Sequence, residues 1–359
     1  MQALVSQSVE SPKLHRHLDR CLGCLACESA CPSGVRYGRL IDSVRALQPK
    51  RLSRVQRYRL SLLSALPYFP ASRLLLRLYQ HSGLRAAMRR VGGEHFRRLD
   101  NLLPTLPDGP GLRSLYRPDR TARGRVALFT GCIGRIADQP ALQASIRLLT
   151  RAGFEVTVPP QQACCGALHQ HNGQPGVAAR LAQKNQIAFN ALELDAIVYI
   201  ASGCGVQLLD YQNLGQPLKA PVSEICSFLI GKGLPESFSF SPLEHKVLIH
   251  QPCSSRRIPG AGAGINELLR RIPGIDLQSL PNEGCCGAAG SYLLLQPVMA
   301  DRLRQPMLEQ IREDGCDILV TSNIGCALHL TAGLGASDSE LEVMHPVQLL
   351  ARQLSQTSP

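Results

Sequence analysis

The sequence QQACCGALH at residues 161–169 returns 121 residues later as NEGCCGAAG at residues 282–290. Two further pairs of segments repeat at nearly the same offset: RVALFTGC (125–132) with KVLIHQPC (246–253), and AIVYIASGC (196–204) with DILVTSNIGC (317–326). Similarity at a fixed period indicates that one structural unit occurs twice. We therefore predict an internal duplication, with a first repeat at residues 119–235 and a second repeat at 236–359.

Each repeat alternates short β-branched runs with helical stretches. In the first repeat the strand-like runs at 125–132, 154–158 and 196–204 are separated by helical patterns at 140–153 and 177–192. This alternation predicts parallel sheets with helices on their faces. The segment 231–245, rich in Gly, Pro and Ser, is predicted to link the two repeats. The predicted fold class is a small helical amino-terminal domain (1–118) followed by two repeated α/β domains, each with a Cys-Cys-Gly motif.

Eight cysteines occupy matched positions in the two repeats: Cys132, Cys164, Cys165 and Cys204 in the first, and Cys253, Cys285, Cys286 and Cys326 in the second. Each lies in or beside a loop that follows a predicted strand, and such loops converge at the carboxyl ends of parallel strands. Gly166 and Gly287 permit a tight turn, and a helix that starts there would favour thiolates. Buried cysteines often pack as small hydrophobic residues, but eight matched positions favour metal or iron–sulfur cluster binding, with zinc a competitor in one repeat. Cys226 and Cys316 lack counterparts and are predicted to be core thiols.

Ahead of the repeats, residues 21–32 read CLGCLACESACP, a C-x2-C-x2-C-x3-C-P run. Three closely spaced thiols can wrap one face of a cubane cluster, and the fourth arrives from the next segment. Zinc sites more often use separated C-x2-C pairs. The spacing therefore favours a [4Fe–4S] cluster over zinc or a disulfide, and residues 1–118 are predicted to form a helical ferredoxin-like [4Fe–4S] domain. Its predicted ligands are Cys21, Cys24, Cys27 and Cys31. The run occurs once, so either Cys31 closes the same cluster or a partner run lies on another chain.

The amino-terminal region carries an excess of positive charge. Residues 1–125 hold 23 Lys and Arg against 8 Asp and Glu, while the remainder holds 16 against 19. This balance suits an acidic partner, an anionic membrane surface or an ordinary solvated face, and no motif indicates nucleic acid. The apolar and basic segment 60–79 fits a membrane surface, although packing against neighbouring helices is favoured. No run reaches membrane-spanning length and no secretory signal is apparent, so we expect a cytoplasmic protein.

Four histidines stand near the cysteine motifs: His169, His171, His250 and His329. They are candidates for tuning a cluster, but surface or helix-capping roles are favoured. PGAGAGIN (259–266) resembles a dinucleotide-binding loop only faintly and is predicted to be a flexible turn. The sequence shows no flavin or nicotinamide fingerprint and no nucleophile motif. Electron transfer is therefore favoured over direct oxidation of a substrate.

The motifs together carry a family likeness. CLGCLACESACPSGVRYGRLID, then GC, CCGALH and SGCG, then PC, CCGAAGSY and NIGC, resemble the iron–sulfur subunits of bacterial glycolate oxidase from Leu18 onward. More distantly, the repeats resemble the Cys-Cys-Gly domains of heterodisulfide reductase and the lactate-utilisation iron–sulfur proteins. In heterodisulfide reductase the motif ends in a C-x2-C pair, whereas here Gln207 follows Cys204 and Asn323 precedes Cys326 at that distance.

The resemblance implies an electron-transfer subunit that works beside flavin-containing subunits oxidising glycolate, or another 2-hydroxy acid such as lactate. Electrons would pass through clusters to an acceptor at the membrane, which implies a peripheral association with the inner membrane face. A second hypothesis is a thiol–disulfide reductase that acts at a Cys-Cys-Gly cluster. A third is a regulatory or zinc-stabilised scaffold.

Overall fold

The computed structural model describes residues 11–48, 52–69, 71–103, 106, 111–258, 260–281, 284–335 and 341–355. Pro259, Asn282 and Glu283 of the quoted motifs lie outside the described residues. A helical amino-terminal region precedes two α/β units, one in each repeat, as the sequence predicts. The duplication is therefore visible in the architecture.

The first repeat contains a five-stranded sheet in the order β1-β3-β2-β4-β5. Its strands are β1 (Leu115–Tyr116), β2 (Gly124–Phe129), β3 (Phe154–Thr157), β4 (Ala196–Tyr199) and β5 (Val222–Glu224). The pairs of β2 with β3, β2 with β4, and β4 with β5 are parallel, and only β1 is antiparallel to its neighbour. The short strand β1 lies ahead of residue 119, where the sequence predicts this repeat to begin.

The second repeat contains a four-stranded parallel sheet in the order β7-β6-β8-β9. Its strands are β6 (Lys246–His250), β7 (Asp276–Ser279), β8 (Ile318–Thr321) and β9 (Glu342–Met344). Sequence order and sheet order match those of β2 to β5. The two sheets are thus two copies of one topology.

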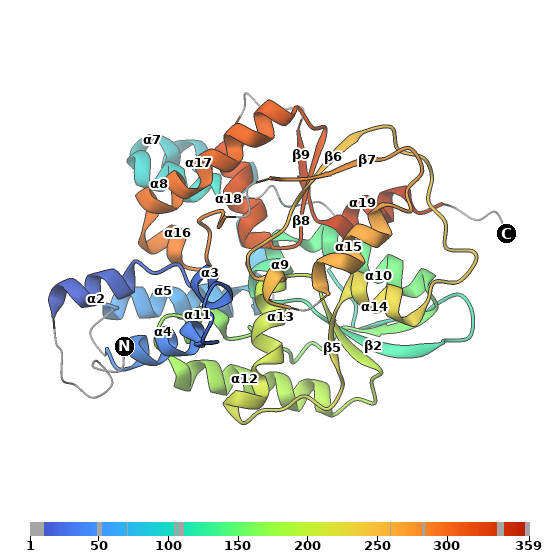
Figure 1. Ribbon diagram of the computed structural model, residues 1–359, viewed down its shortest axis with the longest axis horizontal. Helices are drawn as coiled ribbons and strands as arrows, with labels where there is room; N and C mark the ends of the chain where they lie inside the picture. The colour runs from blue at the N-terminus through green and yellow to red at the C-terminus, as the bar shows by residue number, and fades with distance from the viewer. Residues whose placement is uncertain are drawn as a thin grey trace.

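Four helices lie between the two sheets (Figure 1). They are α10 (Gln139–Arg151) and α14 (Ile225–Lys232) from the first repeat, and α15 (Ala261–Leu269) and α19 (Pro346–Gln353) from the second. Helix α10 packs on α19 and α14 packs on α15, so one apolar core joins both repeats. The linker at 231–245 is part of this core, because Phe238 and Phe240 are buried in it.

The outer face of each sheet has its own helices. The first sheet carries α11 (Ala167–Gln170), α12 (Pro175–Asn190) and α13 (Ser202–Leu209), and the second carries α16 (Tyr292–Leu295), α17 (Pro297–Asp314) and α18 (Ile324–Leu334). The expected flexible turn at 259–266 is wrong for its described part, since α15 begins at Ala261. The helix forms because Ile265 and Leu268 bury their side chains in the shared core.

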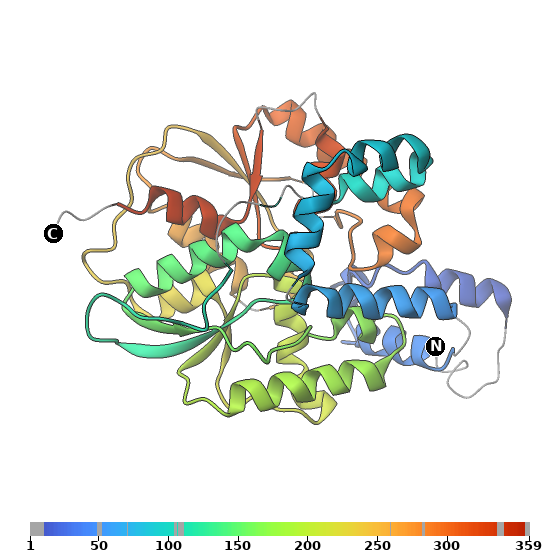
Figure 2. The ribbon, with the colours of Figure 1, turned by 180° about the vertical axis from the view of Figure 1, so that it is seen from behind.

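The amino-terminal region consists of short helices that run along both repeats (Figure 2). They are α2 (Pro12–Asp19), α3 (Ala26–Ser29), α4 (Tyr37–Ala46), α5 (Arg54–Ala65), η1 (Leu66–Tyr68), α6 (Ser72–His81), α7 (Leu84–Val91) and α8 (Gly93–Asn101). None of the helices in the described part of the chain is long and apolar enough to span a bilayer.

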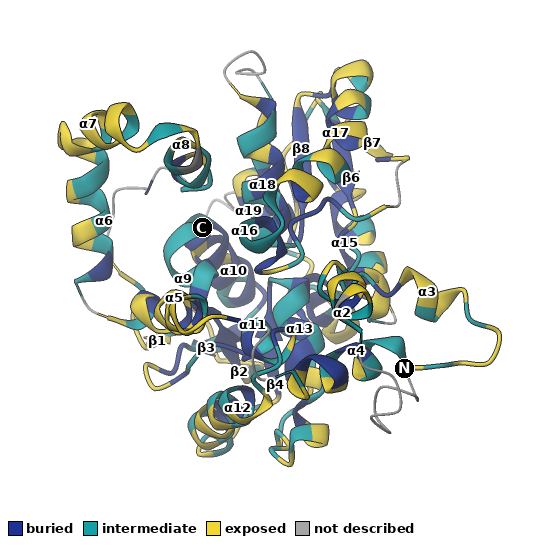
Figure 3. Cartoon of the chain, turned by 90° about the vertical axis from the view of Figure 1, so that its left-hand side faces the viewer, coloured by how far each residue is buried: buried dark blue, intermediate teal, exposed yellow. Residues whose placement is uncertain are grey.

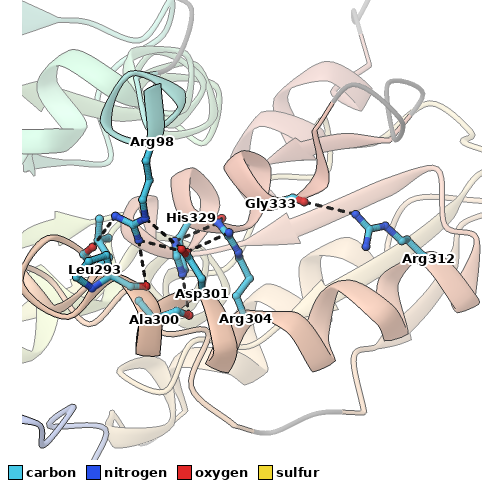
Figure 4. Close-up of polar contacts among 9 residues, drawn as sticks. Arg98, Leu293, Ala300, Asp301, Arg304, Arg312, His329 and Gly333 are labelled. Carbon is cyan, nitrogen blue, oxygen red and sulfur yellow. Dashed lines mark hydrogen bonds and ion pairs between the residues drawn. The ribbon is translucent and has the colours of Figure 1, made fainter. Parts of the chain in front are cut away.

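Two arginines fasten this region to the repeats. Arg45 donates to the carbonyl oxygens of Cys21 (2.6 Å) and His171 (3.0 Å), which joins the cysteine run to the first repeat. Arg98 of α8 donates to both carboxylate oxygens of Asp301 in α17, at 3.1 and 3.2 Å (Figure 4). Arg304 also contacts Asp301, at 3.1 Å. The paired contact of Arg98 fixes orientation as well as position.

Helices α6 and α7 carry a large exposed apolar surface (Figure 3). We call the exposed residues of α6 and α7 the apolar face: Leu74, Leu75, Leu78, Leu84, Met88 and Val91. Leu62, Leu63, Leu66 and Phe69 of the preceding segment are exposed as well. The favoured interpretation of segment 60–79 as a packed helical core is therefore wrong for most of its large side chains, although Leu60 and Pro67 are buried.

A buried carboxylate holds α6, α7 and α8 together. The Asp100 side chain is fully buried and accepts hydrogen bonds from Tyr79 (2.8 Å) and Arg85 (3.0 Å) and from Arg89. Burial alone would raise the pKa of Asp100, but these three donors lower it overall. A carboxyl whose pKa is lowered in the folded state stabilises that state above its unfolded pKa, and the stabilisation disappears as the pH falls through the folded pKa.

We expect Asp100→Asn to destabilise the amino-terminal region by about 2 kcal/mol, because the two arginines lose their charged partner. Thermal unfolding followed by circular dichroism should show a fall in Tm of about 4–8 °C at neutral pH. The difference from the unsubstituted protein should narrow below pH 4. Glu267→Gln, which removes an exposed ion pair with Arg271, should leave Tm unchanged. Equal Tm values for the two variants would contradict the role given to Asp100.

Candidate metal centres

The four predicted cysteines of the first repeat meet at the carboxyl ends of its strands. Cys132 is the first residue of α9 (Cys132–Ala137), which follows β2, and Cys204 is the third residue of α13, which follows β4. Cys164 and Cys165 lie in the loop after β3. Their thiols interact in the order Cys132, Cys164, Cys165, Cys204. The loops thus gather four sulfurs into one place, three of them buried.

The glycine of each Cys-Cys-Gly motif is required by its surroundings. Gly166 has φ of 92°, and a Cβ there would lie 3.2 Å from the Cα and the carbonyl oxygen of Ala178 in α12. Gly287 has φ of 86°, and its Cβ would overlap the carbonyl oxygen of Ala300 in α17. Only glycine combines this backbone conformation with so close an approach. The tight turn expected at both positions is confirmed.

The buried thiols of the first repeat differ in their affinity for a proton. The interaction with Cys164 and then burial raise the pKa of Cys132, and its neighbours and burial raise that of Cys165 in the same way. The pKa of Cys164 is lowered, because both neighbouring thiols donate to it and the Gly166 N–H lies 3.5 Å from its sulfur. Several adjacent thiolates require a positive charge among them. Soft metal ions and iron–sulfur clusters supply that charge, so this donor set fits them.

The second repeat reproduces the arrangement. Cys253 follows β6, Cys326 is the third residue of α18, and the thiols interact in the order Cys253, Cys285, Cys286, Cys326. The sulfurs of Cys286 and Cys326 lie 2.9 Å apart. The interaction with Cys285, together with burial, raises the pKa of Cys253. A metal that binds here must therefore displace protons from the thiols.

Polar side chains connect the two sets of thiols across the boundary between repeats. Asn323 donates through Nδ2 to the hydroxyl oxygens of Ser202 and Ser254, each at 3.2 Å. The two hydroxyl oxygens lie 2.7 Å apart. Ser202 stands two residues before Cys204, and Ser254 follows Cys253. In the second repeat, where a C-x2-C pair would have its first cysteine, the Asn323 side chain instead caps α18 and joins the repeats.

The run CLGCLACESACP forms a loop around the short helix α3. Gly23 and Leu25 have φ of 69° and 60°, so the backbone turns sharply between the cysteines. Cys27 is exposed and the other three cysteines are partly buried. Hydrogen bonds from the backbone of Val35 and Ser33 lower the pKa of Cys31. Backbone donors that stabilise a thiolate also suit a bound anionic cluster.

Two tyrosines, which the sequence analysis did not single out, lie beside the thiols. Tyr292 of α16 donates to the carbonyl oxygen of Arg20 at 3.1 Å. Burial raises its pKa, and the nearby thiols of Cys21 and Cys285 add to that effect. Tyr292 thus lies between the cysteine run and the second repeat. It follows Cys286 by six residues, but no spacing rule assigns a role to that position.

The other tyrosine, Tyr68 of η1, reaches the first repeat from the amino-terminal region. Burial raises its pKa well above the ordinary value, and all four thiols of the first repeat contribute. The guanidinium of Arg135 lies 5.3 Å from the centre of its ring. Because Tyr68 is separated from Cys132 by more than sixty residues, its position depends on the packing of η1 against α9.

The histidines behave differently from the sequence expectation. His171 is exposed and lies 3.1 Å from Asp42, which confirms its predicted surface role. His169, His250 and His329 are all buried, so the favoured surface interpretation is wrong for them. His169 contacts Ser64 at 3.0 Å and Gln174 at 2.6 Å. The expected burial of Cys226 and Cys316 is confirmed.

Comparison with known protein families agrees with this geometry. The family described as a cysteine-rich domain matches twice, at residues 126–209 and 247–331, and a 4Fe-4S binding domain matches at 15–37. A probable glycolate oxidase iron–sulfur subunit of Bacillus subtilis is 30% identical over 93% of this chain and 81% of its own length. The glycolate oxidase iron–sulfur subunit of Escherichia coli is also 30% identical, over 95% and 83%. This chain belongs to the family of glycolate oxidase iron–sulfur subunits.

A more distant relative is lactate utilization protein A of Halalkalibacterium halodurans, which is 25% identical over 64% of this chain and 97% of its own length. The chain is thus an iron–sulfur protein with a 4Fe-4S binding domain ahead of two cysteine-rich domains. The sequence prediction of iron–sulfur cofactors is confirmed. The individual ligands of each centre stay a prediction.

We expect Gly287→Ala to remove the metal centre of the second repeat, because the added methyl group must push the Cys-Cys-Gly loop away from α17. Iron, zinc and sulfide analysis after anaerobic purification should show a loss of metal, with the first repeat and the amino-terminal centre retained. Gly315→Ala is the matched control: φ there is 64°, but no atom lies within 4 Å of the added Cβ. It should cost only about 1–2 kcal/mol and keep the full metal content.

Proposed function

We propose that this chain is the electron-transfer subunit of a glycolate oxidase complex. In this proposal flavin-containing subunits oxidise glycolate to glyoxylate, and this chain carries the electrons from the flavin toward a membrane acceptor. The observation that carries the proposal is the placement of three cysteine sites in one connected molecule, together with the family membership of the chain.

The contacts among the sites support a path for electrons. The cysteine run touches the second repeat through Tyr292 and the backbone of Arg20. From there Ser254, Asn323 and Ser202 lead by hydrogen bonds to the first repeat. Because Cys27 is exposed, the first site lies near the surface, where a partner protein can approach it.

Iron–sulfur clusters, when bound, supply the one-electron chemistry of this path. Cys21, Cys24, Cys27 and Cys31 would hold one cluster, and the backbone of Val35 and Ser33 would stabilise the thiolate of Cys31. The eight cysteines of the repeats would hold two further centres. Tyr292, which is buried, and Tyr68, which is partly buried, limit the access of water beside these centres.

Iron, zinc and sulfide analysis with EPR on anaerobically purified protein tests the assignment. We expect more than four irons per chain and a cubane-type signal on reduction. Cys24→Ser should remove that signal and about four irons, whereas Cys316→Ser, at a buried cysteine outside the three sites, should keep both. Zinc without iron would contradict electron transfer and favour a zinc-stabilised scaffold.

The complex itself is tested by glycolate-dependent dye reduction in cells that contain or lack this chain. Loss of activity on deletion, and its return with the unsubstituted chain but not with Cys24→Ser, is the expected result. Activity that survives deletion would contradict the proposal. The same assay with lactate addresses the second candidate substrate, which the likeness to lactate utilization protein A favours. Reduction of a small disulfide by the purified reduced chain alone would instead favour the thiol–disulfide reductase hypothesis.

We further propose that the apolar face of α6 and α7 docks on an anionic membrane surface. Arg90 of α7 is exposed next to Val91 of this face, whereas Arg85 and Arg89 are held by the buried carboxylate of Asp100. An apolar face bordered by positive charge is typical of helices that lie in the plane of a membrane interface. The acceptor of the electrons would then lie within reach of the complex.

Co-sedimentation with vesicles tests this placement. The purified chain should bind vesicles that contain an anionic phospholipid, more weakly at high salt, and not neutral vesicles. Leu74→Ser with Leu78→Ser should reduce binding about tenfold without changing the metal content. Leu209→Ser, at an exposed leucine of α13 outside the apolar face, is the control. Equal vesicle binding by the unsubstituted chain and both variants would overturn the membrane-docking proposal. Binding of the flavin subunits through the apolar face would also overturn it.

A further inference from the structure

The two metal centres of this chain differ at one position of their otherwise matched frames. His250 is the last residue of β6 and stands where the first repeat has Phe129, the last residue of β2. The partner positions differ too: Phe129 is registered with Tyr199, whereas His250 is registered with Thr321. An aromatic pair in one repeat is thus replaced by a histidine–threonine pair in the other.

The imidazole of His250 reaches the thiols of the second repeat. One of its ring nitrogens and the sulfurs of Cys286 and Cys326 all lie within 4.8 Å of one another. All three residues are buried, with exposures of 2%, 2% and 6%. A tetrahedral site with metal–sulfur bonds of about 2.3 Å places its ligand atoms roughly 4 Å apart, so small movements would bring these three onto one metal atom.

Thr321 holds the ring in a suitable orientation. Its hydroxyl oxygen lies 2.8 Å from Nδ1 of His250. In the tautomer with the proton on Nδ1, that nitrogen donates to Thr321 and the lone pair of Nε2 is left for a metal. A hydrogen bond on the second nitrogen is the usual support of a metal-binding histidine. His250 also borders a cavity of about 160 Å³, which is lined in part by Arg256 and Asn266.

The first repeat offers no such nitrogen at this position. Phe129 packs with Cys132, Cys164 and Cys165, and its ring lies 6.1 Å from that of Phe189. The buried His169 of the first repeat has its two ring nitrogens bonded to Ser64 and Gln174, which leaves the four cysteine sulfurs as the donors of the first centre.

We propose that His250 is a ligand of the metal centre in the second repeat, beside Cys286 and Cys326. The remaining positions go to Cys285 or Cys253, the next sulfurs in the row of thiols. The first repeat then holds its metal through sulfur alone, and the second through sulfur and one imidazole. Replacing a thiolate by a neutral imidazole raises the reduction potential of an iron–sulfur centre and also suits zinc. This inference rests on metal binding by the second repeat, which is part of the proposed function.

The test uses the full chain, purified anaerobically and labelled with ¹⁵N-histidine. If the centre contains iron, pulsed EPR should show coupling to a histidine nitrogen. If it contains zinc, X-ray absorption at the zinc edge should show a mixed nitrogen and sulfur shell. His250→Phe, which copies the first repeat, should abolish the nitrogen signal. His329→Phe removes another buried imidazole of the same repeat, whose Nε2 contacts the carbonyl oxygen of Ala300 at 3.2 Å, and should leave the signal unchanged.

The spectrum of the unsubstituted chain shows whether a histidine nitrogen binds the metal, even if the variants fold poorly. Cys286→Ser shows whether the second repeat holds metal, because the metal content should fall. Metal in the second repeat with an all-sulfur shell would overturn the role of His250 and leave the electron-transfer proposal intact. An unchanged metal content in Cys286→Ser would overturn this inference. The proposed function is tested separately, by glycolate-dependent dye reduction in cells that carry Cys24→Ser.

Discussion

The repulsion among buried sulfur atoms is the constraint around which this protein is built. Each repeat drives four thiols into a confined region, and several adjacent thiolates are unfavourable there unless a cation neutralises them. In its described part the folded chain supplies local compensation, from backbone donors near Cys164 and Cys285 and from the first turns of α9, α13 and α18. Strand order, the glycine turns and the helix starts all serve to bring these loops together, so the metal is part of the architecture as well as of the chemistry.

Much of the fold follows from sequence pattern alone. Strands β2, β4, β6 and β8 contain short apolar runs that are buried, which is the pattern of central parallel strands, and their duplication predicted a parallel sheet in each repeat. Strand β7 gave no such signal: its sequence is DLQS, mostly exposed at the edge of the sheet, and only its pairing with β6 makes it a strand. The start of α15 was not predicted for a similar reason. Its glycines have low helix propensity, and the helix is stabilised by packing against residues that are distant in the sequence.

The convergence of the cysteines could be predicted because their spacing and repetition place them in loops that meet at the same end of each sheet. The burial of His169, His250 and His329 could not be predicted from sequence. Local sequence does not say which face of a sheet or helix a polar side chain will occupy. Tyr68 and Asn323 show the same limit: their contacts join segments far apart in the chain. The apolar residues of α6 were predicted to pack against neighbouring helices but are exposed. A helical apolar pattern predicts one face that avoids water, and it does not reveal whether the same chain covers that face.

The helices between the sheets have a consequence for the history of the molecule. Helix α10 corresponds in the repeat to α15, and α14 corresponds to α19; the observed contacts are α10 with α19 and α14 with α15. The first helix of each repeat therefore packs on the second helix of the other repeat. This reciprocal pattern is the one found in a two-fold symmetric dimer. The chain is organised as such a dimer fused end to end. A true dimer must keep its two centres identical, whereas a fused one frees each half to change alone, as Phe129 and His250 have done.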